Sequence, residues 1–449
     1  MTAPAAHREA EQELDRAIGP WALGANAVNL TVGAGIFALP ALVAALLGPA
    51  AILAYVACGA LMLLVLACFA EVGTRVTRSG GAVAYIEEAF GPLAGFVAWV
   101  VFVLAYAAAS DAAVAHVFMD AVAIWVPALR DGPGRNIALV LLFAGLVAVN
   151  VRGVRHGTRL SVVTTVGKLV PMLLLVAVGA FAIQGANLQW TAWPTGAKLG
   201  EAALLLFFAF GGAETALTPS GEIRDPARTV PRGILGGILG VVLLYASLQL
   251  VAQGVLGGSL ASGGNTPLAD LAERLAGMPG RNLILACTAV STFGLLAADL
   301  ICTPRSFLVA AESGMLPRAA GRVHPRYRTP HVAIAAFGAM ILVFAVSGGF
   351  RALAIFSSLA LLLTYLAVAL AVLRLRRTRP AEAGTFRLPG GPVVPLLASA
   401  AVLWVASHST WKEFAAMGAV IALSVLYYFL RRNAASGSAS LKRRLGCCR

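Results

Sequence analysis

Two apolar stretches of the chain carry glycine-rich interruptions at their centres, and an interrupted helix exposes backbone groups that can bind charge. The first stretch covers residues 21–47 and contains VGAGIF at 32–37; the second covers residues 199–219 and contains FAFGGAE at 208–214. Glycine inside a helix costs about 1 kcal/mol relative to alanine, and unwound backbone is tolerated in a membrane only where protein or a cavity covers it. Paired interruptions therefore indicate two discontinuous helices around a ligand site.

The first interruption offers backbone groups of both charges. If the helix stops near Val32, the N–H groups of Ala34, Gly35 and Ile36 begin a new half-helix, and such an end carries partial positive charge that favours a carboxylate. The carbonyl groups that end the first half, near Thr31, carry partial negative charge and suit an ammonium group. Alternatively, the two glycines only allow close helix packing, but the matching second interruption favours the ligand site.

The second interruption adds carbonyl groups, aromatic rings and a carboxylate. The carbonyl groups of Phe208, Ala209 and Gly211 become available to an ammonium group if the helix unwinds there. The rings of Phe208 and Phe210 flank the break, where they either gate the site and cover the apolar part of a ligand or pack in the core. Glu214 follows directly, and carboxylates inside membrane spans are costly and usually functional. Its alternative role is a structural hydrogen-bond acceptor that ties the unwound turn to a neighbour.

Other charged residues also fall inside apolar segments. Lys168 is the only Lys or Arg there, and it needs a carboxylate or several carbonyl groups unless it is neutral for part of the time, which would allow proton exchange. The alternative is a permanent charge that tethers the first interruption. Asp299 could pair with Lys168, contact a cationic ligand or pack against polar neighbours. We expect Asp111, and His116 and Asp120 beyond it, to be solvated on the outer side.

These residues require membrane helices to position them. The chain is 59% hydrophobic and 12% charged, with a mean hydropathy of +0.84, whereas a soluble domain carries about 25% charged residues. Apolar runs of about 20 residues can cross the hydrocarbon core of a bilayer. The sequence predicts twelve such spans, which begin near residues 20, 50, 92, 135, 160, 199, 233, 282, 331, 352, 392 and 414.

The net charge of +14 does not indicate a nucleic-acid partner, because the basic residues are distributed by side of the membrane. With the N-terminus in the cytoplasm and every span crossing once, 26 of the 34 Lys and Arg fall in cytoplasmic segments, seven in external loops and one within a span. This asymmetry predicts that both termini are cytoplasmic and that most of the basic residues meet anionic lipid head groups. The expected location is the cell (inner or plasma) membrane.

Soluble enzyme chemistry has no support in the sequence. There is no P-loop and no Cys/His metal spacing, and no nucleophile stands beside any of the six histidines. We therefore expect no catalytic residue, no metal and no cofactor. Four of the six cysteines lie in predicted spans as small apolar packing residues, and Cys447 and Cys448 close a basic tail, either as reduced thiols or as lipidated ones.

The expected architecture is all-α, with a five-plus-five inverted repeat and discontinuous helices at spans one and six. Five spans separate the two interruptions, and this odd number inverts the second unit relative to the first. We predict a cytoplasmic N-terminal segment at 1–16, a first repeat at 17–184 and an inverted second repeat at 197–375. Two extra C-terminal helices would lie at 390–432, followed by a basic cytoplasmic tail at 433–449.

Four passages resemble the amino acid–polyamine–organocation (APC) transporters, whose fold is of the LeuT type. They are VGAGIFALP at 32–40, FFAFGGAE at 207–214, GEIRDPARTVP at 221–231, and the segment from TPR at 303–305 through ESGMLP at 312–317 to Pro330. Their order and spacing match the family, and the likeness covers about residues 17–430.

The resemblance implies roles for particular residues. It implies carboxylate binding at the N–H groups of Ala34 and Gly35, and amine binding at the carbonyl groups of Thr31, Phe208 and Gly211. Phe208 matches a gating aromatic residue. Glu214 matches a glutamate that couples conformational changes, and Lys168 matches a lysine that stands in for a sodium ion in proton-dependent or ion-independent members. Asp299 departs from relatives that carry an aromatic residue or an amide near this point, which makes a cationic substrate more plausible.

Together these observations predict a secondary active amino acid transporter that works by alternating access, with uptake coupled to protons. The alternatives are an exchanger or exporter of cationic amino acids or polyamines, and a membrane sensor that binds amino acids without moving them. The expected partners are the amino acid, protons and membrane lipids.

Overall fold

The computed structural model describes residues 17–76, 79–152, 157–190, 192–312, 314–378 and 385–446. Within these ranges it does not describe the side chains at 157–166, 312 and 433–446. The predicted N-terminal segment 1–16 and the cysteines at 447 and 448 lie outside the described residues. The described chain is helical and contains no strand; one isolated bridge pairs Ile18 with Ile223.

The helices follow one another with short connections. The α-helices are α2 (Pro20–Thr31), α3 (Gly35–Leu47), α4 (Ala51–Arg75), α5 (Gly81–Phe90), α6 (Pro92–Val100), α7 (Ala109–Val122), α8 (Gly132–Arg152), α9 (Gly157–Gly179), α10 (Gly196–Phe210), α11 (Pro226–Leu256), α12 (Ser259–Ser262), α13 (Pro267–Glu312), α14 (His331–Ser347), α15 (Phe350–Thr378), α16 (Val393–Ala406) and α17 (Trp411–Gly446). Between α6 and α7, η2 (Val101–Ala108) is a π-helical stretch. The 3₁₀ turns are η1 (Gly48–Ala50), η3 (Pro127–Leu129), η4 (Ala180–Ala182), η5 (Gly185–Leu188), η6 (Ala213–Leu217), η7 (Ser220–Glu222) and η8 (Arg318–Gly321).

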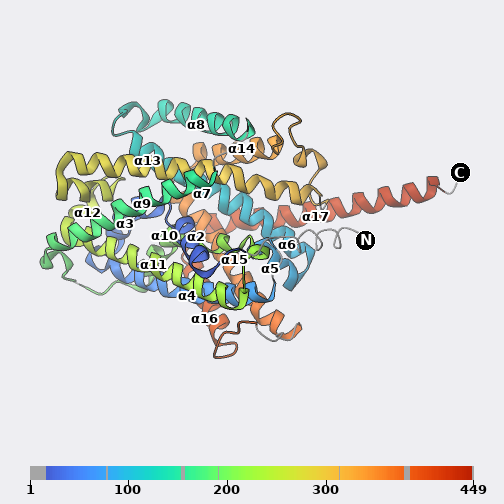
Figure 1. The fold of residues 1–449 in the computed structure, drawn as a ribbon, viewed down its shortest axis with the longest axis horizontal. Coiled ribbons are helices and arrows are strands. Elements are labelled where there is room, and N and C mark those ends of the chain that lie inside the picture. The colour runs from blue at the N-terminus through green and yellow to red at the C-terminus, as the bar shows by residue number, and fades with distance from the viewer. Residues whose placement is uncertain are drawn as a thin grey trace.

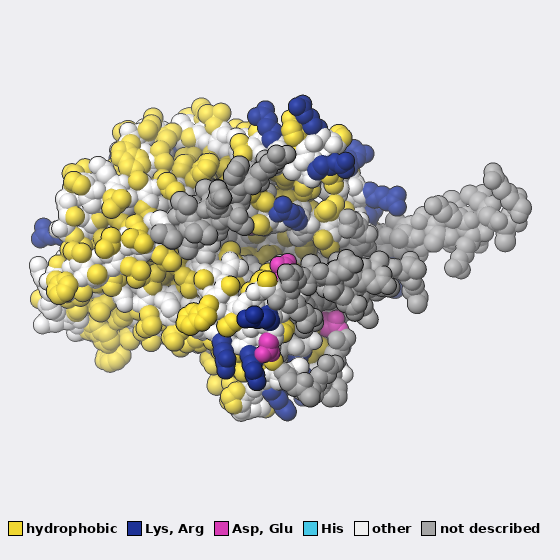
Figure 2. All heavy atoms as spheres, viewed as in Figure 1, with side chains coloured by type: hydrophobic (Ala, Val, Ile, Leu, Met, Phe, Trp, Pro, Cys, Tyr) yellow, Lys and Arg dark blue, Asp and Glu magenta, His cyan; other side chains and the backbone are white. Residues whose placement is uncertain are grey.

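Eight helical segments of the described chain are long and apolar enough to cross a membrane. They are Gly35–Arg75, Pro92–Val122, Gly132–Arg152, Gly196–Leu217, Pro226–Leu256, Pro267–Ala311, Phe350–Thr378 and Trp411–Arg432, and three shorter apolar helices cover Gly167–Ala182, His331–Ser347 and Val393–Ala406. The chain is therefore a multi-pass helical membrane protein. On the face shown in Figure 2, apolar side chains cover most of the surface, and Lys and Arg gather toward the end from which α17 projects in Figure 1.

The interrupted segments lie in the middle of the bundle. Helix α11 packs along α2 and α4, and α10 packs against α3, α4 and α15. Most side chains of α3 and α10 are buried. Helix α8, which lies at the edge of the bundle in Figure 1, and α17 expose many apolar side chains. The core thus encloses both glycine-rich interruptions.

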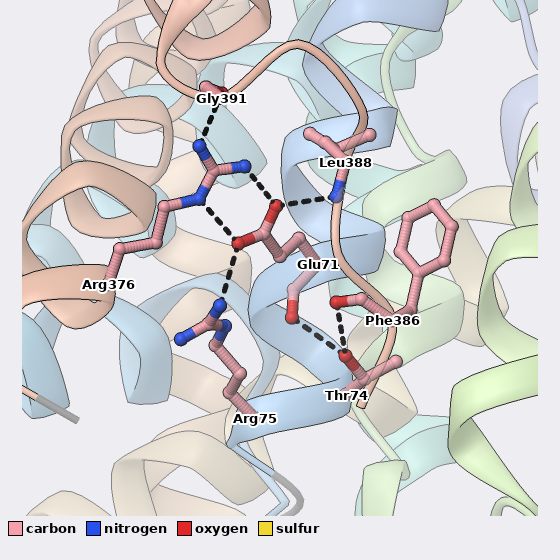
Figure 3. Close-up of polar contacts among 7 residues, drawn as sticks. All are labelled: Glu71, Thr74, Arg75, Arg376, Phe386, Leu388 and Gly391. Atoms are coloured by element: carbon pink, nitrogen blue, oxygen red, sulfur yellow. Dashed lines mark hydrogen bonds and ion pairs between the residues drawn. The ribbon is translucent and has the colours of Figure 1, made fainter. Parts of the chain in front are cut away.

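Helix α4 continues to Arg75 and includes Glu71 near its C-terminal end. Glu71 is fully buried and its carboxylate accepts four hydrogen bonds (Figure 3): from Arg75 at 3.0 Å, from two nitrogens of Arg376 at 2.7 and 2.5 Å, and from the Leu388 N–H at 2.9 Å. Arg376 also donates to the Gly391 carbonyl. A buried charge is tolerated only when it is paired in this way, and the pairing joins α4, α15 and the segment before α16.

Candidate functional site

The first interruption separates α2 from α3. Helix α2 ends at Thr31, Val32 leaves the helical conformation with φ −73° and ψ 83°, and α3 begins at Gly35. The Gly33 N–H donates to the Thr31 carbonyl at 2.8 Å, which makes a tight turn. The N–H groups of Ala34, Gly35 and Ile36 donate to no described backbone acceptor. They therefore form an open helix N-terminus of the kind that binds anions.

The second interruption separates α10 from the short turn η6. Gly211 is extended (φ −66°, ψ 153°), and Gly212 has φ 115°, a conformation that favours glycine. The Glu214 carboxylate accepts the Gly212 N–H at 3.0 and 3.2 Å, and it accepts the Tyr365 hydroxyl at 2.8 Å. Glu214 is 2% exposed. Its contacts are those expected of an acceptor that ties the unwound turn to a neighbouring helix.

The two interruptions lie against each other. A Cβ atom on Gly35 would stand 2.6 Å from the Ala209 Cβ and 2.7 Å from its Cα, and one on Gly212 would stand 2.5 Å from the Leu30 carbonyl oxygen. The Tyr245 hydroxyl, on α11, lies 3.0 Å from the Thr31 carbonyl and 3.2 Å from the Ala209 carbonyl. Glycine is needed at both positions because the backbones of the two breaks approach so closely.

The aromatic residues beside the second break have different surroundings. Phe208 is 9% exposed and meets the ring of Phe350 edge to face, with 5.5 Å between ring centroids. Phe350 also lines a cavity of about 620 Å³, together with residues of α3 such as Ala38 and Leu42. Phe210 is fully buried against Tyr245, with 5.2 Å between ring centroids. Phe208 therefore lies behind Phe350, which forms part of the cavity wall, whereas Phe210 packs in the core.

Lys168, on α9, reaches the first break. It is 6% exposed, and its Nζ donates to the Asn29 carbonyl at 2.6 Å. Asn29 lies two residues before the end of α2, where helix carbonyl groups carry partial negative charge. The carbonyl group that Lys168 binds therefore lies about one helical turn before the open N–H groups of the first break.

Of the roles considered for Asp299, pairing with Lys168 is not observed and contact with polar neighbours is. Among the described residues no ion pair joins it to Lys168; it accepts the Thr303 hydroxyl at 2.7 Å and faces Asp111 of α7 at hydrogen-bonding range. Leu295, one turn earlier on α13, lies beside the first break, since a Cβ atom on Gly33 would stand 3.1 Å from its Cδ1. Asp299 thus lies one helical turn from the interruption, beside a second carboxyl group.

The outer residues are less solvated than expected. Asp111 is 3% exposed and His116 is 8% exposed, so the prediction of solvated positions is wrong for both. Every residue from Asp111 to Val117 is buried, because α7 packs against α13, α14 and α15. This part of α7 therefore has no solvated face.

The structure therefore brings most of the predicted site residues together, while Phe210 faces the core. Sequence reasoning missed three tyrosines that surround the breaks. Tyr245 and Tyr365 donate to groups of the breaks, and the Tyr106 hydroxyl lies 3.0 Å from the position of a Cβ on Gly211. Their only sequence signal is a hydroxyl group inside an otherwise apolar run, because a buried tyrosine needs a hydrogen-bond partner.

The arrangement suits a small zwitterion. Open N–H groups on one side of the first break can hold a carboxylate, and the carbonyl groups on the other side can hold an ammonium group. Among the described residues, no group of three or more His, Cys, Asp or Glu side chains is placed to hold a metal ion.

Comparison with known proteins gives a consistent family assignment. A sequence model of the family described as "Amino acid permease" matches residues 18–430. The serine/threonine exchanger SteT of Bacillus subtilis is 27% identical over 424 residues, which cover 91% of this chain and 95% of SteT. The branched-chain amino acid permease BcaP of the same species is 24% identical over 441 residues, or 94% of each chain. The chloroplastic cationic amino acid transporter 9 of Arabidopsis thaliana is 30% identical over 333 residues, covering 70% of this chain and 58% of that protein.

Proposed function

Because the chain belongs to the amino acid permease family, we propose that it is a secondary active transporter that carries an amino acid into the cell together with protons. The observation that carries this proposal is the packing of the two interruptions, with Gly35 against Ala209. It places an open helix N-terminus and free carbonyl groups in the middle of the bundle, where a transported zwitterion must be recognised.

The proposed topology has twelve spans in a five-plus-five inverted repeat. The segment Gly35–Arg75 holds two helices that meet at the turn Gly48–Ala50, and α2 completes the first of these spans. Counting that segment twice and adding the three shorter apolar helices to the other seven candidates gives twelve. The basic residues gathered near the projecting end of α17 support a cytoplasmic location for both termini, in the inner or plasma membrane.

In the proposed site, the substrate carboxylate binds the N–H groups of Ala34, Gly35 and Ile36. The substrate ammonium group binds carbonyl oxygens of Thr31, Phe208 and Gly211. The Thr31 carbonyl already accepts the Tyr245 hydroxyl at 3.0 Å and the Gly33 N–H at 2.8 Å. These two donors use both lone pairs of the oxygen, so the ammonium group would take the place of one of them.

Access to the site would alternate between the two sides of the membrane. The cavity lined by Phe350 leads toward Phe208, so separation of these two rings would open the site to the outside. Glu214 ties the second break to Tyr365 on α15, which would transmit movement of the unwound turn to that helix. Alternating access needs such contacts between elements that move relative to each other.

Lys168 would couple transport to protons. When charged, its ammonium group strengthens the hydrogen bond to the Asn29 carbonyl at the end of α2. Release of the proton would weaken that bond and free the end of α2, which lies next to the substrate carbonyl groups. The alternative keeps Lys168 permanently charged as a tether, in which case the protein would exchange substrates without a proton gradient.

A cationic amino acid or polyamine exchanger is the rival within transport. It is favoured by the carboxyl groups of Asp299 and Asp111, which lie side by side one turn from the first break. Among the relatives named above, two carry names for neutral substrates and one for cationic substrates. An Asp299→Asn variant that loses transport of lysine and arginine but keeps neutral substrates would favour the rival, and an unchanged substrate range would exclude it.

The test is uptake of a panel of labelled amino acids into proteoliposomes under an imposed proton gradient, an imposed sodium gradient, or neither. Uptake driven by the proton gradient alone supports the proposal and identifies the substrate. Uptake only into vesicles preloaded with amino acid indicates an exchanger. Binding without uptake under every condition identifies a sensor and overturns the proposal.

A further inference from the structure

A second polar cluster lies away from the substrate site, around His116 on α7. Arg135 of α8 donates to the His116 Nδ1 at 2.8 Å and to its carbonyl oxygen at 3.2 Å. The His116 Nε2 lies 3.0 Å from the Ala345 carbonyl and 2.8 Å from the Gly348 carbonyl, at the end of α14. Both ring nitrogens of this nearly buried histidine are therefore engaged.

These partners fix the protonation state of the ring. A guanidinium group only donates hydrogen bonds and a backbone carbonyl only accepts them. Nδ1 must therefore be an unprotonated acceptor, and Nε2 must carry the hydrogen. The geometry allows one form only, which is the neutral Nε2–H tautomer of His116.

The cluster continues to the cavity that leads toward Phe208. Arg135 also donates to Asp120 Oδ1 at 2.6 Å, and Asn265 donates to Asp120 Oδ2 at 3.0 Å. Asp120 and Asn265 both line that cavity. The charged groups that face His116 are thus Arg135 from α8 and Asp120 from its own helix, while α14 contributes only carbonyl groups.

We propose that Nδ1 of His116 is a proton-binding site on the external side, and that its protonation loosens the cavity wall formed by residues 257–266. The assignment of this side as external rests on the proposed topology, whereas proton binding does not depend on transport. A proton on Nδ1 places two donors, and two cations, 2.8 Å apart. Arg135 must then withdraw from the ring, and Asp120 becomes the natural partner of the new imidazolium.

Protonation of His116 would affect residues 257–266 through Asp120. Its carboxylate holds Asn265 by a single hydrogen bond, and a shift of Asp120 toward the imidazolium would lengthen or break it. One hydrogen bond of this kind contributes about 0.5–1.5 kcal/mol. External acid would therefore favour a wider opening of the cavity at this segment.

The proton site can be tested directly by NMR of the full-length protein labelled with ¹⁵N in the histidine rings, in nanodiscs. The chain has six histidines, and the signals that vanish in His116→Gln assign the pair. We expect an Nε2–H tautomer at pH 8 that converts to the imidazolium on acidification, and a conversion at higher pH in Arg135→Gln, which removes the facing cation. An Nδ1–H tautomer at pH 8, or a ring still neutral at pH 4, would overturn the proposal.

The effect on the wall segment can be measured by hydrogen exchange of a peptide that covers residues 257–266. Comparing wild type with His116→Gln at one pH removes the intrinsic pH dependence of exchange. At pH 5 we expect wild type to exchange about threefold to tenfold faster than the variant, and at pH 8 equally fast. His408→Gln is the matched control, because His408 contacts only the Trp404 carbonyl and ring among its described polar and aromatic partners, and it should follow wild type. Equal exchange of wild type and His116→Gln at pH 5 would refute the link to the wall, whatever the transport assay shows.

Discussion

The two helix interruptions differ in whether their backbone N–H groups have an acceptor. At the second, the chain supplies its own carboxylate, since Glu214 takes the Gly212 N–H and a hydroxyl from α15. At the first, the N–H groups of Ala34, Gly35 and Ile36 meet no described backbone acceptor. The second break thus shows within the same molecule how a carboxylate sits on an unwound turn, and the corresponding place at the first break is the one that we propose for the substrate carboxylate.

The largest effect is expected from Gly35→Leu, which fills the open break. Its Cβ would stand 2.7 Å from the Cα of Ala209, so the two breaks must separate and the open N–H groups must move. We expect loss of substrate binding and uptake, measured by calorimetry and in proteoliposomes. The control is Gly240→Leu on α11, because nothing lies within 4 Å of a Cβ at Gly240. Unchanged affinity in Gly35→Leu would remove the first break from the site.

Next in size is Lys168→Ala, which removes the cation beside the first break. We expect net uptake driven by a proton gradient to vanish, while substrate binding persists because the N–H groups of the break remain. The readouts are uptake against an imposed proton gradient and binding at equilibrium. Retention of pH-dependent uptake by the variant would assign Lys168 a tethering role only.

A smaller effect is expected from Glu214→Gln, which replaces the carboxylate at the second interruption with a neutral amide. A hydrogen bond to a charged group contributes about 1.5–3 kcal/mol and one to a neutral group about 1 kcal/mol, so thermal unfolding in detergent should shift down by a few degrees. If the role is structural, uptake falls in proportion to stability. Loss of uptake with an unchanged unfolding temperature would instead support a role in coupling.

The smallest effect is expected from Tyr245→Phe, which removes the hydroxyl that bridges the two breaks. The substitution keeps the ring against Phe210 and removes a donor from the Thr31 and Ala209 carbonyl groups, while Thr31 keeps the Gly33 N–H. We expect a change of about fivefold in substrate affinity, which corresponds to about 1 kcal/mol. A change above about a hundredfold would mean that the hydroxyl itself contacts the substrate.

The sequence predicts the positions of both interruptions, because glycine has a local reason to be there. Gly35 and Gly212 are required by backbone contacts, and a constraint of this kind is visible in the sequence as a glycine at one position. The helical class and the membrane location follow from composition and run length. Twelve spans and the inverted repeat remain predictions.

Contacts between distant segments were not predictable from the sequence. Tyr245 and Tyr365 reach the breaks from α11 and α15, and nothing local distinguishes them from other buried tyrosines. The burial of Asp111 and His116 was also missed, because α13, α14 and α15 cover α7 on all sides and come from distant parts of the sequence. Polar residues near a helix end look alike whether they face water or a neighbouring helix.

The buried carboxylate of Glu71 bears on how the protein is made. Its main partner, Arg376, follows 305 residues later in the chain, so α4 enters the membrane long before α15 leaves the ribosome. Until then the carboxylate has Arg75 of its own helix as a partner, and the segment around Leu388 has not been synthesised. Biogenesis therefore cannot complete the packing of α4 until most of the chain has been translated, and in a product truncated before residue 376 the carboxylate would lack three of its four hydrogen-bond donors.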